Sequence, residues 1–322
     1  MALCCVFCYH DPMASQLEKS ILAAVAYFDI FDYPLTLIEI HRFVLNLSGS
    51  FEGASLFEAR GCLERSQFLK DKIHFKNGFF YLRGSDKIIK IRHERYIIAK
   101  QKFDRAREII SMLARAPFVR AIFVCNSLAF HNAKKESDID LVIITKKGGV
   151  WLSRLFCLLL LSMMRIRPGY KNTRNKICLS MFMDENHLDF SHLKMGKRDI
   201  DFMYWVLNFY ALYDSRGLYK KFWNANKDWL KQNMPNASLA YTHSHRYIKA
   251  KPRLRVIVEY VLRPFSIIAE SIQRAKFPSR IRDIMNQDTR VRVEDGLLKF
   301  HVNDKRLEHL EAFVKKYEKV MQ

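Results

Sequence analysis

Two aspartates on one side of a predicted strand are the residues best placed to do chemistry. Asp138 and Asp140 open the run Asp-Ile-Asp-Leu-Val-Ile-Ile-Thr, 138–145, which is otherwise apolar enough for a buried strand. Because alternate residues of a strand project to the same face, both carboxylates point the same way. Side-by-side carboxylates repel unless a cation lies between them, so the pair could hold Mg²⁺ together with phosphate oxygens. An ordinary strand entry with solvated acids is the alternative for an isolated Asp-x-Asp.

A serine earlier in the chain offers a place for phosphate. Residues 118–125 are β-branched and apolar enough for another buried strand, and 127–133 could form a short helix. The hydroxyl of Ser127, with the first N–H groups of that helix, could hold a terminal phosphate.

The wider pattern resembles the core of the polymerase-beta-like nucleotidyltransferase superfamily, over roughly residues 117–215. A hydrophobic strand, a small-residue turn with Ser127, a spacer and then Ser137-Asp-Ile-Asp-Leu match the order found there. The resemblance implies that Asp138 and Asp140 are the metal-binding carboxylates, catalytic through two Mg²⁺ ions. It also implies that the nucleotide is bound around Asn126, Ser127 and Ser137. Such enzymes move a nucleotidyl group from a nucleoside triphosphate to an acceptor and release pyrophosphate.

Two departures from the superfamily pattern bear on activity. Asn126 stands where the pattern has glycine; asparagine tolerates positive φ, but its side chain could obstruct phosphate. The superfamily often has a third carboxylate on a later strand, and the predicted strand 176–183 has none. Asp184, just past its end, is our candidate for the third metal ligand. Without a third acid, the domain could be a catalytically weak or inactive nucleotide-binding relative.

The first part of the chain predicts a winged helix-turn-helix over 17–84. The helix predicted over 17–33 is followed by two capping boxes, Thr36 with Glu39 and Ser55 with Glu58, that open two more helices. The alternating run 72–82 around Asn77-Gly78 then predicts a hairpin. Such a module binds DNA through its third helix or serves packing and protein contact, and both uses stay open.

The remaining segments complete a mixed α+β fold with a small mixed sheet. We predict a charged linking helix over 85–116, an apolar helix over 151–164 and a helix over 199–213, and a basic helical region over 216–322. This order of parts also resembles that of uncharacterised bacterial nucleotidyltransferase-domain proteins.

The composition favours a globular chain with an anionic partner. The 322 residues are 49% hydrophobic, which excludes a disordered chain, and 54 Lys and Arg against 33 Asp and Glu give a net charge of +21. Nucleic acid, nucleotide phosphate and an acidic membrane surface all fit that charge. The longest apolar run, 155–164, is too short to span a bilayer, and we expect no membrane partner.

The cysteines indicate a reduced, cytoplasmic protein. The chain has seven cysteines, too few for a disulfide scaffold, and four of them sit singly in apolar runs. Cys4, Cys5, Cys8 and His10 could hold zinc, but we expect residues 1–16 to be a disordered N-terminus.

Three functional hypotheses follow. The first is a metal-dependent nucleotidyltransferase whose partner is a nucleoside triphosphate and whose acceptor is unknown, with nucleic acid as one candidate partner. The second is a nucleic-acid-binding regulator whose transferase-like domain is a sensor or scaffold. The third, a glycosyltransferase, ranks low because its Asp-x-Asp usually ends a strand, whereas Asp138 and Asp140 begin one.

Overall fold

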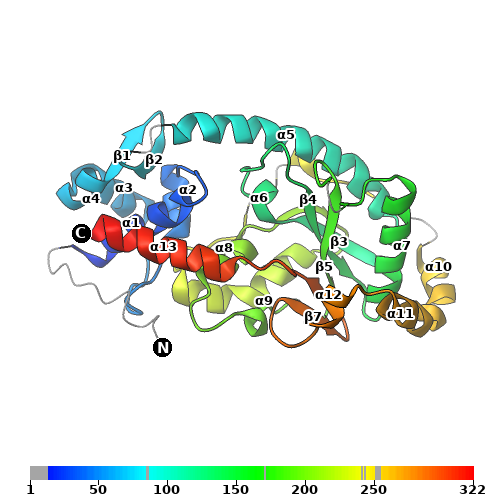
Figure 1. Cartoon of the computed structure of the whole chain (residues 1–322). Coiled ribbons are helices and arrows are strands. Elements are labelled where there is room, and N and C mark those ends of the chain that lie inside the picture. The colour runs from blue at the N-terminus through cyan, green and yellow to red at the C-terminus, as the bar shows by residue number, and fades with distance from the viewer. Residues whose placement is uncertain (1–13, 85–86, 170–171, 241, 243, 251–254) are drawn as a thin grey trace.

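The computed structural model describes residues 14–84, 87–169, 172–240, 242, 244–250 and 255–322. The predicted zinc ligands, and most of the N-terminal segment expected to be disordered, lie outside these ranges. Figure 1 shows an elongated molecule, with the N-terminal helices and a hairpin at one end and a larger sheet at the other. Helix α5 (Ile88–Leu113) runs along one side and connects the two ends.

Capped helices and a hairpin form the N-terminal end. Its elements are α1 (Gln16–Asp29), α2 (Leu37–Phe43), α3 (Leu56–Arg65), α4 (Gln67–Lys72), β1 (Ile73–Lys76) and β2 (Phe79–Leu82). Both predicted capping boxes form, and Ser15 with Glu18 adds a third at the start of α1. The predicted hairpin is confirmed, since β1 and β2 pair antiparallel across Asn77-Gly78, both at positive φ. Helix α4 was not predicted, and the assignment to the winged-helix class stays a prediction.

A six-stranded sheet in the order β6-β3-β4-β5-β8-β7 forms the other end. Its strands are β3 (Val119–Val124), β4 (Ile139–Thr145), β5 (Ile177–Asp184), β6 (Tyr210–Asp214), β7 (Val291–Glu294) and β8 (Leu297–Phe300). Strands β4 and β5 are parallel, and the other neighbouring strands are antiparallel. The fold is therefore mixed α and β with a small mixed sheet, as predicted.

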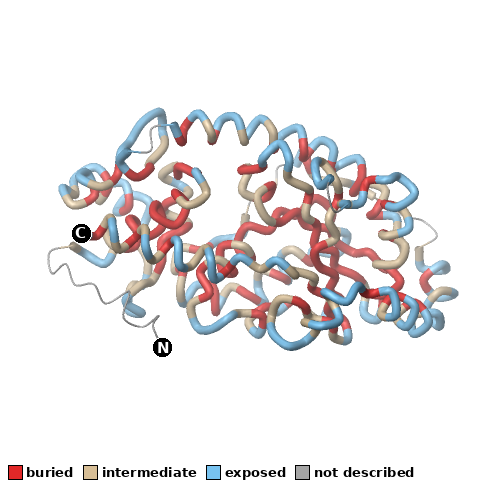
Figure 2. The backbone as a smooth tube through the Cα atoms, in the orientation of Figure 1, coloured by how far each residue is buried: buried red, intermediate tan, exposed pale blue. Residues whose placement is uncertain are grey.

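Helices and short 3₁₀ turns surround this sheet. They are α6 (Asn126–Ala129), α7 (Val150–Met163), η3 (Ser191–Leu193), α8 (Ile200–Leu207), α9 (Leu218–Asn233), η4 (Ser244–Arg246), α10 (Arg255–Leu262), η5 (Arg263–Phe265), α11 (Ser266–Ala275), α12 (Ser279–Arg282) and α13 (Arg306–Met321). Figure 2 shows the sheet as the most continuously buried part of the molecule.

Two predicted helical segments contain strands instead. The helix predicted over 199–213 ends at Leu207, and its second half is β6 at one edge of the sheet. The region 216–322 is not wholly helical, because β7 and β8 form a hairpin that extends the sheet beyond β5. The turn of this hairpin is Asp295-Gly296, with Gly296 at φ +80°, a hairpin signal that the sequence analysis overlooked.

One hydrophobic core joins the two ends. It includes Phe28 of α1, Phe123 of β3, Tyr204 of α8 and Phe313 of α13. Helix α13 packs against α1, so the last helix of the chain lies on the first. No helix among the residues described here is long and apolar enough to cross a membrane.

Candidate metal and nucleotide site

The antiparallel pairing of β3 and β4 brings the predicted site residues together. Val124 pairs with Leu141, and the Cys125 N–H donates to the carbonyl oxygen of Asp140 at 3.1 Å. The end of β3 therefore lies beside the beginning of β4. The turn that carries Asn126 and Ser127 meets the strand entry that carries Asp138 and Asp140 at one edge of the sheet.

Asn126 occupies the position where the superfamily pattern has glycine, and it has the backbone conformation that glycine favours. Its φ is +56°, in the left-handed region that asparagine tolerates better than most residues. Its side-chain oxygen accepts a hydrogen bond from Trp205 Nε1 at 2.7 Å, and the side chain also hydrogen-bonds to Asp140. Asn126 thus connects α8 to Asp140, and its side chain fills the space that a glycine would leave open.

Asp140 is held by neutral hydrogen-bond donors. Ser180 Oγ donates to its Oδ1 at 2.7 Å, and Cys178 lies directly opposite it on β5. Burial raises the pKa of Asp140 above its usual value, although hydrogen bonds from Asn126 and Ser180 oppose this. The carboxylate is therefore positioned rigidly, but it is costly to ionise without a cation beside it.

Asp138 titrates closer to neutrality than an ordinary aspartate. Burial and then the charge of Asp140 raise the pKa of Asp138 to about 6, while Lys102 acts in the opposite direction. The Lys102 side chain, from α5, is only 2% exposed and donates to the carbonyl oxygen of Ser137 at 2.7 Å and to Asn175 Oδ1 at 2.8 Å. Burial lowers the pKa of Lys102. Lys102 thus holds in place the loop that leads into Asp138.

The predicted nucleotide-binding serines differ in their surroundings. Ser127 lines a cavity beside the turn, whereas the Ser137 hydroxyl donates to the carbonyl oxygen of Lys134 at 2.8 Å. Ser127 is therefore placed to meet a bound molecule, and Ser137 instead stabilises the loop before β4.

Asp138, Asp140 and Cys178 form a group that could hold a metal ion. Ligand atoms of Asp138, Asp140 and Cys178 all lie within 4.8 Å of one another. Two carboxylates suit Mg²⁺ or Mn²⁺, whereas a thiol suits softer metals. Burial raises the pKa of the Cys178 thiol, which keeps it protonated. The third member of the cluster is thus the neutral thiol of Cys178. Among the described residues, no additional carboxylate joins the cluster.

Asp184 does not reach the pair. On the parallel strands β4 and β5, Asp140 pairs with Cys178 whereas Asp184 pairs with Thr145. Asp184 lies six positions after Cys178 on β5, about 20 Å further along at about 3.3 Å per residue. Asp184 instead accepts hydrogen bonds from the Asn186 N–H at 2.9 Å and interacts with His187 Nδ1 at 2.7 Å. Asp184 is therefore not a ligand of the same ion as Asp138 and Asp140.

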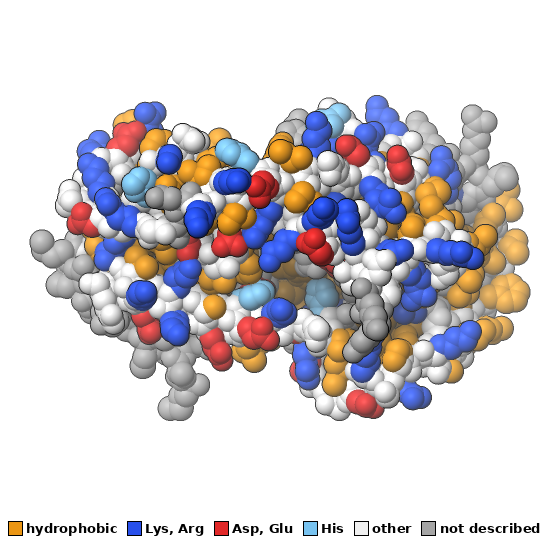
Figure 3. All heavy atoms as spheres, turned by 45° about the horizontal axis from the view of Figure 1, so that its top comes forward, with side chains coloured by type: hydrophobic (Ala, Val, Ile, Leu, Met, Phe, Trp, Pro, Cys, Tyr) orange, Lys and Arg blue, Asp and Glu red, His pale blue; other side chains and the backbone are white. Residues whose placement is uncertain are grey.

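A cavity of about 360 Å³ adjoins the turn. Aromatic side chains from both ends of the molecule line much of it, and they include Tyr27, Phe31, Tyr33, Phe130, Tyr204 and Trp205. Figure 3 shows a hollow at the waist of the molecule, between the two ends. Asn126 and Ser127 line the cavity, so it opens onto the turn next to the paired aspartates.

Basic residues of the C-terminal segment form part of the polar lining of the cavity. Lys299 is 1% exposed, and burial, followed by the charge of Arg306, lowers its pKa to about 7. Burial lowers the pKa of His301 to about 3, and its Nε2 is buried without a hydrogen-bond partner among the described atoms. Arg306 pairs with Asp199 and Asp304, at 2.7 Å each. The wall therefore combines aromatic surface with a neutral imidazole and a buried lysine whose pKa is lowered.

Several residues near the pair were not predicted as part of the site. Cys178 and Ser180 were assigned to a strand without a carboxylate, and Trp205 was interpreted as core. Lys102 was counted only as part of a charged helix.

No family model matches the chain, and neither a curated protein nor a solved structure is significantly similar to it.

Proposed function

We propose that the chain binds a nucleoside triphosphate with a divalent cation at Asp138 and Asp140, and transfers a nucleotidyl group to an acceptor. The observation that carries the proposal is the meeting of the Asn126-Ser127 turn with the two carboxylates at one sheet edge. A phosphate-binding turn and a metal-binding pair have to be adjacent for this reaction. The likeness of the sequence pattern to polymerase-beta-like nucleotidyltransferases supports the same activity.

The surroundings of each residue suggest its role in the reaction. Asp138 and Asp140 hold the cation, which when bound would neutralise phosphate charge and orient the attacking hydroxyl. The hydroxyl group of Ser127 donates a hydrogen bond to a phosphate oxygen beside the cavity. Asp140 is positioned by Ser180 and Asn126, and the pKa of Asp138 is raised to about 6 by burial and by the charge of Asp140.

The adjoining cavity supplies room for the organic part of a substrate. Small-molecule sites commonly measure about 300 to 1,000 Å³ and are mostly apolar with a few polar groups. Aromatic walls favour a planar group, and Lys299 and His301 offer polar contacts at one side.

A transfer assay tests the proposal. The protein is incubated with α-labelled nucleoside triphosphates, Mg²⁺ and a cell extract as the source of acceptors. The double variant Asp138→Asn, Asp140→Asn should lose transfer completely. Glu136→Gln removes an exposed carboxyl group two positions before the pair and should keep transfer, which makes it the matched control. Equal label transfer by wild type and double variant would exclude the proposed chemistry.

Binding of nucleotide without efficient transfer is the second candidate function. Ser180 and Cys178 beside Asp140 favour it, because neither supplies the third carboxylate that usually completes such a site. In that case the wild-type protein would bind Mg²⁺ and a triphosphate, yet give no label transfer above the level of the double variant.

A further inference from the structure

Helix α10 presents its apolar side to solvent. Val256, Ile257 and Tyr260 are 75%, 65% and 83% exposed, whereas Glu259 is 2% exposed. Glu259 is the one buried residue of the helix. A surface helix normally buries its apolar residues and exposes its acids. The orientation of α10 is the reverse of that rule.

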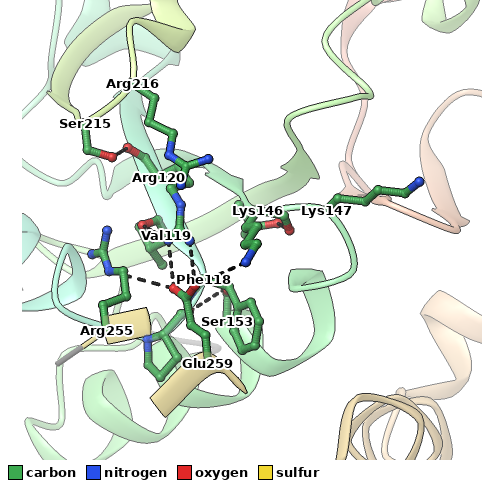
Figure 4. A network of polar contacts seen from close by, with 12 residues as sticks. Phe118, Val119, Arg120, Lys146, Lys147, Ser153, Ser215, Arg216, Arg255 and Glu259 are labelled. Carbon is green, nitrogen blue, oxygen red and sulfur yellow. Dashed lines mark hydrogen bonds and ion pairs between the residues drawn. The ribbon is translucent and has the colours of Figure 1, made fainter. Parts of the chain in front are cut away.

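A buried ion-pair network fixes this orientation (Figure 4). Glu259 accepts hydrogen bonds from the Phe118 N–H at 2.8 Å and from Arg120 Nη1 and Nη2 at 2.8 and 2.6 Å. Arg255 and Lys146 lie within 4.0 Å of the same carboxylate. Rotating α10 to bury its apolar side would leave Arg120, 3% exposed, without its partner.

Helix α11 repeats the arrangement. Ile267, Ile268 and Ile272 are 76%, 55% and 46% exposed, while Ala269 and Gln273 are buried. Gln273 Nε2 donates to the carbonyl oxygen of Trp151 at 2.8 Å, so a polar side chain again anchors the helix to α7. Two consecutive helices thus turn apolar side chains outward.

We define the α10–α11 face as the large apolar residues of these helices and the turn between them that are at least half exposed. They are Val256, Ile257, Tyr260, Val261, Phe265, Ile267 and Ile268. Figures 1 and 2 place both helices at the end of the molecule opposite to α3, with much of their length exposed. A monomer rarely exposes so many large apolar groups within one short segment unless they contact something.

Basic residues accompany the α10–α11 face. Arg263 lies between the two helices, and Lys276, Arg280 and Arg282 follow them, all exposed. The acidic Glu270 of α11 is paired with Arg274 at 2.7 Å. Figure 3 shows blue side chains beside the large orange area at this end. A second copy would bring like charges together across a two-fold contact, whereas an anionic bilayer offers both an apolar interior and negative headgroups.

We propose that the α10–α11 face docks on an anionic phospholipid surface, with its apolar side chains in the headgroup and acyl boundary and its basic residues on the phosphates. Tyr260 suits that depth, because tyrosine is favoured at membrane interfaces. This departs from the sequence-based expectation of no membrane partner. It is independent of the proposed nucleotidyl transfer.

Vesicle sedimentation tests the docking. The full chain is mixed with vesicles of equal parts phosphatidylcholine and phosphatidylglycerol, or of phosphatidylcholine alone. We expect binding to the anionic vesicles, weakened when salt rises from about 0.1 to about 0.5 M. The double variant Ile257→Asp, Ile267→Asp should bind at least about tenfold more weakly. Phe57→Asp, at a 78% exposed residue of α3, is the matched control and should bind like wild type.

Tryptophan depth probes report which face touches the lipid. In anionic vesicles with brominated acyl chains, Tyr260→Trp should add quenched fluorescence, and Phe57→Trp should not. Circular dichroism confirms that each variant is folded. Absence of binding, equal binding to neutral vesicles, or quenching at position 57 would overturn the proposal. So would a wild-type dimer in sedimentation velocity that the Ile257→Asp, Ile267→Asp variant dissociates.

Discussion

At the scale of single residues, the paired aspartates bind protons more readily than ordinary carboxylates do. Burial raises the pKa of both carboxyl groups, and the charge of Asp140 adds to the shift at Asp138. A bound cation would reverse the balance, because it stabilises both ionised forms at once. Metal binding at this pair would therefore be linked to proton release.

The affinity for Mg²⁺ should fall in acid. The pKa of Asp138 lies at about 6 in the metal-free protein, so a proton must leave before the ion binds at lower pH. We expect the affinity at about pH 5 to be about tenfold weaker than at about pH 8, with the change centred near pH 6. Isothermal titration with MgCl₂ alone measures this without interference from nucleotide protonation. An affinity independent of pH, or one that strengthens in acid, would contradict the linkage.

Ser180 occupies the place from which a third carboxylate could act. Ser180→Asp puts a carboxyl group beside Asp140, where the hydroxyl now lies 2.7 Å away. We expect Mg²⁺ to bind about tenfold or more tightly, and the metal-free protein to lose about 1 to 3 kcal/mol of stability through like-charge repulsion and lost hydrogen bonding. Titration with Mg²⁺ and urea unfolding check both effects. Ser180→Ala is the control, and it should lose stability without gaining affinity.

At the scale of elements, the predictions that agree with the structure are those that rest on a local sequence signal. Capping boxes at Thr36 and Ser55 and the Asn77-Gly78 turn define their elements within a few residues. Strand β6 was missed because Tyr210–Asp214 is a short apolar run with no alternation, and such a run cannot be told from a helix by periodicity. The β7–β8 hairpin has a local turn signal, Asp295-Gly296, but the whole region around it was predicted to be helical.

The attachment of α10 depends on one buried carboxylate. Burial opposes ionisation of Glu259, but hydrogen bonds from Arg120 and Phe118 outweigh it and hold its pKa below the usual value. Glu259→Gln leaves the buried Arg120 without a counter-charge, and we expect a loss of about 3 to 5 kcal/mol in the free energy of unfolding. Urea denaturation followed by circular dichroism measures it. Glu270→Gln, which breaks a partly exposed pair of α11, is the control with an expected loss below about 1 kcal/mol. Similar losses for both variants would contradict a special role for Glu259.

At the scale of the whole molecule, segments distant in sequence meet around the cavity. Tyr27 of α1 and His309 of α13 both hydrogen-bond to Asp201 of α8, at 2.7 and 2.8 Å. Lys316 of α13 also pairs with Asp29 of α1. The last helix thus connects the N-terminal end to the sheet end, and the wall of the cavity depends on all three segments.

The same long-range packing explains which part of the candidate site the sequence could predict. Asp138 and Asp140 lie two residues apart at the beginning of β4, and Asn126 and Ser127 are adjacent, so the order of residues along the chain was enough to predict them as site residues. Lys102 and Ser180 reach the pair, and Trp205 reaches Asn126, from other elements through tertiary packing, and no local pattern marks them. Asp184 was chosen for its place in the sequence, but the parallel register of β4 and β5 puts it at the far end of the strand.

The shared core predicts that both ends of the molecule unfold together. The core that contains Phe28 of α1 also contains Phe123 and Tyr204, so neither end keeps its packing without the other. We expect urea unfolding monitored by tryptophan fluorescence, which reports the sheet end, to coincide with the helical signal in circular dichroism. A helical transition at clearly lower urea would show that the N-terminal helices unfold separately.

Nucleotide binding by calorimetry tests the central claim most directly, because it needs no knowledge of the acceptor. Wild type is titrated with a non-hydrolysable nucleoside triphosphate in the presence and absence of Mg²⁺, beside Asp138→Asn, Asp140→Asn and the control Glu136→Gln. We predict binding by wild type and by Glu136→Gln that requires Mg²⁺, and its loss in the double variant. Absence of binding to wild type, or undiminished Mg²⁺-dependent binding to the folded double variant, would contradict the assignment of Asp138 and Asp140 as the metal and nucleotide site.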